Sequence, residues 1–134
     1  MFKKLLVIVF VLSLVLAGCG GKPALNKIDV TMTDFKYTPD SATIAAGQTI
    51  TLNATNNGAV KHEYVIMKHG LDIGADFGPE DEDNIYWEQE VEPGKSVSVT
   101  FTAPSDLGDY QIVCGIAGHF TAGMVSKLTV VAAK

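Results

Sequence analysis

Short segments in which apolar and polar residues alternate run through most of this chain, and they constrain its fold more than any other feature. Near the start of the domain, for example, Ile28, Val30 and Met32 alternate with polar residues, as in a strand with one buried face. Turn signals separate the segments, and no segment shows a sustained helical period. The pattern predicts an all-β sandwich or barrel of about eight strands. The expected strands are residues 28–33, 43–45, 49–54, 62–67, 86–91, 96–101, 110–114 and 124–131.

One long stretch interrupts the alternation. Residues 69–84 are rich in Gly, Asp, Glu and Pro, and nine of the chain's 15 acidic residues lie between Asp72 and Glu92. We expect one long acidic surface loop there, with room for a short helical turn. The acidic 72–92 region has two possible roles: a binding surface for a basic partner, or simply a solvated loop.

The N-terminus has the features of an export signal. Met1-Phe2-Lys3-Lys4 begins it with positive charge, and residues 5–16 are almost all apolar, which is too short for a confident membrane span. The following Leu16-Ala17-Gly18-Cys19 resembles the bacterial lipobox, in which the Cys is lipidated. We therefore expect a signal peptide at 1–18, a lipidated Cys19 with a tether at 19–26, and one domain at 27–134. An uncleaved anchor and an ordinary signal with a chance Cys are the alternatives.

This signal predicts an exported protein, lipid-anchored on the outer face of the cytoplasmic membrane or in the periplasm. Removal of residues 1–18 would take away Lys3 and Lys4, leaving eight basic residues against 15 acidic ones and a formal charge of −7. The chain contains no Arg. Nucleic acid is therefore excluded as an expected partner, because binding it requires clustered basic residues. A basic or neutral protein partner is favoured instead.

Three metal-binding side chains follow one another at equal spacing near the C-terminus. Cys114, His119 and Met124 lie five residues apart each time. Soft sulfur together with imidazole suits copper, and Cys with His donors and a weak axial Met is the ligand set of an electron-transfer copper site. A fourth donor has to come from elsewhere in the chain. His62, at the start of an expected strand, is a better candidate than His69, which precedes Gly70 in the acidic stretch.

Each of these residues also has an ordinary structural explanation. Alone, Cys114 could be a buried thiol, His119 a surface residue and Met124 a core residue that fills a gap. Together, at this spacing, they indicate a metal site, because metal ligands occur as sets. A metal would also protect Cys114, which is the only thiol left in an exported protein if Cys19 carries lipid.

The spacing Cys-x4-His-x4-Met, preceded by Gly108-Asp109-Tyr110 and followed by a Val/Leu/Thr strand, resembles that of the cupredoxins. The closest likeness is to their plastocyanin, auracyanin and azurin branches, the small blue type 1 copper proteins, and it covers residues 27–132. The resemblance implies a Greek-key β-sandwich that holds one copper ion. His62, Cys114 and His119 would form its strong trigonal plane, with Met124 as the long axial donor.

The resemblance also implies a function and a docking surface. A mononuclear blue-copper protein passes single electrons between redox partners, here membrane-associated and unidentified, and is not an enzyme. Partners of cupredoxins dock on a flat apolar patch around the C-terminal His, which in this chain would include Ile116, Ala117 and Phe120. We expect a monomer.

Glu63 departs from the family pattern. Most cupredoxins have Asn after the first His, and its side chain helps tie the two ligand segments together. We predict that Glu63 instead accepts hydrogen bonds around the site and, if ionised, favours Cu(II) and lowers the reduction potential.

Two other functions compete with electron transfer. One is extracytoplasmic copper trafficking or storage, although such sites are usually open and Met- or His-rich, and this chain has four Met in all. The other is a copper enzyme such as a nitrite reductase or oxidase, which needs a second copper centre. With three His in the chain, only His69 would remain to build one.

Overall fold

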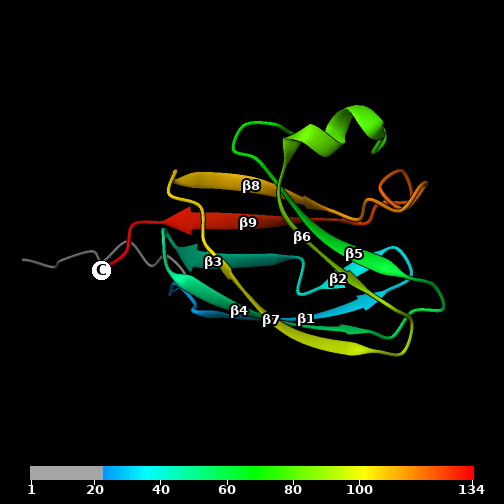
Figure 1. Ribbon diagram of the computed structural model, residues 1–134, viewed down its shortest axis with the longest axis horizontal. Coiled ribbons are helices and arrows are strands. Elements are labelled where there is room, and N and C mark those ends of the chain that lie inside the picture. Colours follow the sequence, from blue (N-terminus) through cyan, green and yellow to red (C-terminus); the bar gives the residue numbers. More distant parts are fainter. Residues whose placement is uncertain (1–22) are drawn as a thin grey trace, which may run out of the picture.

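The computed structural model describes residues 23–134, so the predicted signal peptide, Cys19 and residues 20–22 of the tether lie outside the described residues. Within that range the chain forms nine strands and one short 3₁₀-helix (Figure 1). No helix there is long and apolar enough to cross a membrane. The elements are β1 (Lys27–Thr33), β2 (Lys36–Thr38), β3 (Ser41–Ala45), β4 (Thr49–Asn56), β5 (His62–Met67), η1 (Pro79–Asn84), β6 (Ile85–Val91), β7 (Ser96–Thr102), β8 (Gly108–Val113) and β9 (Val125–Val131).

The strands form two sheets, which confirms the predicted all-β sandwich. One sheet has the order β2-β1-β4-β7 and the other β3-β9-β8-β5-β6. The pairs β1–β4 and β3–β9 are parallel and the other pairs are antiparallel, because the chain repeatedly crosses between the sheets. The connection between β8 and β9 lies at the end of the sandwich opposite the C-terminus (Figure 1).

The additional strand is β2, which the sequence did not predict. The first expected strand, residues 28–33, ends at Thr33 as β1 does. A two-residue turn of Asp34 and Phe35 follows, and the chain folds back so that Thr33 pairs with Lys36. The turn is unusual because Phe35 has a φ of 68°, a conformation that normally favours Gly or Asn.

The inner faces of the two sheets meet in one large apolar core. The alternation predicted for β1 is confirmed, since Ile28, Val30 and Met32 are all buried in it. In the second sheet, Tyr64 and Ile66 of β5 face the same core. Each side chain of this size contributes about 1.5–3 kcal/mol when it is fully buried. The core thus supplies a rigid support for the ends of β5, β8 and β9.

The acidic stretch packs on β5 and β8 of the five-stranded sheet and contains η1, the short helical turn that was expected (Figure 1). It is not only a solvated loop. Ile73 is buried and Phe77 half-buried in a second apolar cluster on Val65 and Met67 of β5 and Val113 of β8. The Ile73 amide also donates a hydrogen bond of 2.7 Å to the Gln111 side chain. The region is therefore anchored to the strands that lead to His62 and Cys114.

Candidate metal centre

Three of the predicted ligands converge at one end of the sandwich. His62, Cys114 and His119 are buried, and their donor atoms all lie within 4.8 Å of one another. The two Nδ1 atoms are 3.2 Å apart, and Cys114 Sγ lies 3.3 Å from Nδ1 of His119 and 4.0 Å from Nδ1 of His62. A point equidistant from these three atoms lies about 2 Å from each, which is the usual bond length between a first-row metal ion and imidazole nitrogen. The donor set and its spacing therefore fit a copper ion.

The strands bring these residues together because β5 and β8 are neighbours. Val65 pairs with Val113, so the beginning of β5, at His62, lies beside the end of β8, where Cys114 follows. His69, the competing histidine, lies beyond the other end of β5. It is exposed and stacks on Tyr110, with ring centroids 5.0 Å apart. The structure thus brings His62, and not His69, to Cys114 and His119.

The fourth predicted ligand, Met124, is fully buried next to the same loop. Its amide donates to the carbonyl of His119 at 3.0 Å, and its carbonyl accepts from the amide of Cys114 at 3.3 Å. Gly118 and Gly123 have positive φ values of 81° and 97°, which allow the tight turns of this loop. The backbone of Met124 is therefore tied to two of the three converging residues.

Burial favours the uncharged form of two of these donors, the thiol of Cys114 and the neutral imidazole of His119. Burial raises the pKa of the Cys114 thiol, while hydrogen bonds from the amides of Glu63 and Ile116 act in the opposite direction. A metal ion would make the thiolate the stable form. Burial, followed by the neighbouring His62, lowers the pKa of His119 and so favours the neutral imidazole that binds metals.

Glu63 contacts the site through its backbone. Its amide lies 3.4 Å from Cys114 Sγ and donates to it, while its carbonyl accepts a hydrogen bond from Tyr37. The half-buried carboxylate lies so close to Gly115 that a Cβ there would be 2.6 Å from Oε2. Burial, then Glu88 and Glu90, raise the pKa of this carboxyl. Its predicted influence on the potential stays a prediction.

That prediction is tested by Glu63→Gln, which keeps the size and the backbone hydrogen bond but removes a negative charge next to a ligand. We expect a higher reduction potential, because the charge favours Cu(II) over Cu(I). Voltammetry of the copper-loaded protein measures it. The control for loss of a distant charge is Asp106→Asn, in the exposed connection before β8, at the other end of that strand from Cys114. No rise in Glu63→Gln, or an equal rise in both variants, would contradict the assigned role.

Of the expected docking patch, Ala117 is exposed, whereas Ile116 and Phe120 are half-buried. Phe120 packs against the second apolar cluster. The aromatic ring next to His119 is instead Phe35, which is 45% exposed and meets the imidazole edge-on with centroids 5.1 Å apart. Phe35 and its neighbour Asp34 were not expected at the site from the sequence, because both reach it through a turn that no local pattern marks.

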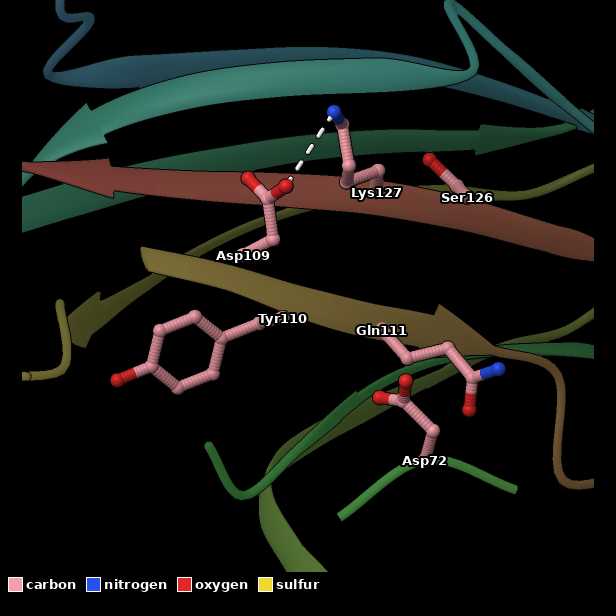
Figure 2. A pocket seen from close by; sticks show the side chains of 6 residues that line it. All are labelled: Asp72, Asp109, Tyr110, Gln111, Ser126 and Lys127. Atoms are coloured by element: carbon pink, nitrogen blue, oxygen red, sulfur yellow. Dashed lines mark hydrogen bonds and ion pairs between the residues drawn. The ribbon is translucent and has the colours of Figure 1, made fainter. Parts of the chain in front are cut away.

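One surface pocket lies away from these residues. A pocket of about 280 Å³ is formed on β8 and β9, where Asp109 and Lys127 face each other across the strands and Asp72 closes one side (Figure 2). None of the converging donors lines it. The metal-binding residues are therefore enclosed by protein and do not border this pocket.

Comparison with known proteins agrees with the fold and the donor set. Residues 5–130 match the model of the cupredoxin-like domain family. Auracyanin-A of Chloroflexus aurantiacus is 30% identical, with 93% of this chain and 94% of that protein covered. Its solved structure, described as that of a "blue" copper protein, has a TM-score of 0.64 at 30% identity and covers 78% of this chain and 98% of that one.

Two further relatives are similar. The structure of dithionite-reduced auracyanin from Roseiflexus castenholzii has a TM-score of 0.68 and 30% identity, covering 81% of this chain and 99% of that one. The copper-resistant cuproprotein CopI of Rubrivivax gelatinosus is 29% identical, over 80% of this chain and 67% of that protein. With the family model matching nearly the whole chain and the expected donors side by side, the protein belongs to the cupredoxin-like family.

Proposed function

We propose that this protein carries single electrons at one type 1 copper ion that His62, Cys114, His119 and Met124 would hold. The observation that carries the proposal is the convergence of two imidazole nitrogens and one thiol sulfur in a buried site. Bound copper supplies a one-electron Cu(II)/Cu(I) couple that accepts this mixed donor set in both states. The similarity to the auracyanins supports the same function.

The protein contributes rigidity and exclusion of water. His62, Cys114 and Met124 are fully buried, and the ligand loop is tied to itself by the hydrogen bonds of Met124. Donors held this firmly move little when the charge at the site changes, which favours fast electron transfer. Four protein donors would also leave no obvious open position for a substrate, unlike a hydrolytic metal site.

Electrons would enter and leave at the His119 end. His119 is 7% exposed, and Ala117 and Phe35 are exposed beside it. A small apolar patch is sufficient for the weak, transient contacts of redox partners. We propose that the docking surface includes Ile116, Ala117 and Phe120. Lipid on Cys19, followed by the tether, would hold this surface near membrane-associated partners outside the cytoplasm.

Copper trafficking or storage is the second candidate, supported by the similarity to the copper-resistant cuproprotein CopI. The two functions differ in what happens to the metal on reduction. A carrier has to retain Cu(I), whereas a trafficking protein has to release it. The buried donors favour retention.

Copper retention through redox cycles distinguishes an electron carrier from a trafficking or storage protein. The protein is loaded with one equivalent of Cu(II), reduced with ascorbate and reoxidised with ferricyanide in the presence of a Cu(I) chelator, bathocuproine disulfonate. We expect the copper to stay with the protein over several cycles, as measured by the colour of the chelator complex. Transfer of most of the copper in the first reduction would favour trafficking instead.

A further inference from the structure

A carboxylate outside the ligand set contacts His62, one of the fully buried proposed ligands. His62 Nδ1 faces Cys114 and His119, and its other ring nitrogen, Nε2, lies 3.1 Å from Oδ1 of Asp34. Asp34 comes from the turn between β1 and β2, in the opposite sheet. The hydrogen bond therefore joins the two sheets at the metal-binding end of the sandwich.

Asp34 is itself held in place. The amide of Ala59 donates to both carboxylate oxygens, at 3.0 and 3.3 Å. Gly58 packs so closely that a Cβ there would lie 2.4 Å from Asp34 Oδ1 and 2.7 Å from His62 Nε2. The buried Asn56 fixes this loop, because its side chain accepts from the Gly58 amide at 2.8 Å and donates to the carbonyl of Val60 at 2.8 Å.

The contact determines which nitrogen of His62 is available to a metal. A neutral imidazole has one N–H donor and one acceptor nitrogen. An ionised carboxylate can only accept, so the proton of His62 belongs on Nε2, and the lone pair on Nδ1 then points toward Cys114 and His119. Without this partner, the Nδ1–H form would direct a proton toward the metal position.

We propose that Asp34 is a positioning residue that holds His62 as the Nε2–H tautomer and so prepares Nδ1 to bind copper. The inference rests on the proposed copper site. Partners of this kind for metal-binding histidines typically change metal affinity by about 10–100-fold when they are removed. The same turn also places Phe35 against His119, so one short connection contacts both imidazoles.

Two variants and a control test the proposal. Asp34→Ala removes the acceptor, and Asp34→Asn keeps an acceptor oxygen without the charge. Asp40→Asn, in the exposed turn that follows β2, is the control for loss of a nearby surface charge. Copper affinity is measured by chelator competition, and the tautomer of His62 by long-range ¹H–¹⁵N NMR of the metal-free protein, in which no copper occupies Nδ1. Binding of one copper by the unaltered protein tests the proposed site separately.

We expect Nε2–H at His62 in the unaltered protein, an affinity about 10–100-fold lower in Asp34→Ala, and recovery of most of that loss in Asp34→Asn. Asp40→Asn should bind as the unaltered protein does. An Nδ1–H tautomer at His62 in the unaltered protein would overturn the proposal, whether or not Asp34→Ala folds. A copper affinity of Asp34→Ala within about twofold of that of the unaltered protein would also overturn it. The same holds if Asp34→Asn binds copper as weakly as Asp34→Ala.

Discussion

Cys114→Ser should abolish the intense visible absorption of the copper-loaded protein. A thiolate is the only donor in this set that gives an intense thiolate-to-copper band, and Cys114 is the one free cysteine in the described part of the chain. A serine hydroxyl is a hard donor that does not ionise readily, so copper affinity should also fall. Loss of a residue that only hydrogen-bonds to a ligand lowers metal affinity by about 10–100-fold. Loss of the ligand itself should therefore lower the copper affinity by more than about 100-fold.

The matched control is Cys19→Ser, the same substitution at the other cysteine. It removes the predicted lipidation site and none of the four proposed copper ligands, so the protein should keep its full absorption. Absorption spectra and copper titrations of both variants measure the effect. A Cys114→Ser protein that retains the band would show that the ligand has been assigned wrongly.

Ile112→Ala should cause a large loss of stability. Ile112 is fully buried in the core of β8, two residues before Cys114, and it pairs with Ile66 of β5. Truncation of such a side chain removes buried apolar surface and leaves a cavity, so the free energy of unfolding should fall by about 2–5 kcal/mol. Denaturant unfolding of the metal-free protein measures this directly.

The same variant separates the scaffold from the site. Val99→Ala, at a half-buried position of β7, should cost much less because less surface is lost there. Folded Ile112→Ala should still bind copper with an unchanged visible band, since no donor is altered. A loss of stability no greater than that of Val99→Ala would mean that the core at β8 is less tightly packed than the structure implies.

Much of the fold follows from local patterns in the sequence. Strands such as β1 and β4 bury one face and expose the other, and this produces the alternation that predicts them. β2 was missed because three residues are too few to show a period, and because the turn at Phe35 uses a residue that rarely adopts positive φ. The packing of Ile73 and Phe77 onto the sheet was missed because it depends on tertiary contacts, not on spacing.

Some residues of the candidate site could be predicted from the sequence, and others could not. Cys114, His119 and Met124 lie on one loop, so their spacing in the sequence carries the signal. His62 could be chosen over His69 because it begins a strand that continues the core pattern. Asp34 could not be found, because its contact with His62 joins residues 28 positions apart from opposite sheets. Only the register of the folded strands determines that pairing.

A copper titration of the full chain, followed by visible absorption, tests the central claim most directly. We expect an intense band that grows until one copper is bound per chain, disappears on reduction with ascorbate and returns fully on reoxidation. A colourless protein that binds only Cu(I), or a band that needs more than one copper per chain, would contradict a single copper ion held by these two imidazoles and two sulfurs.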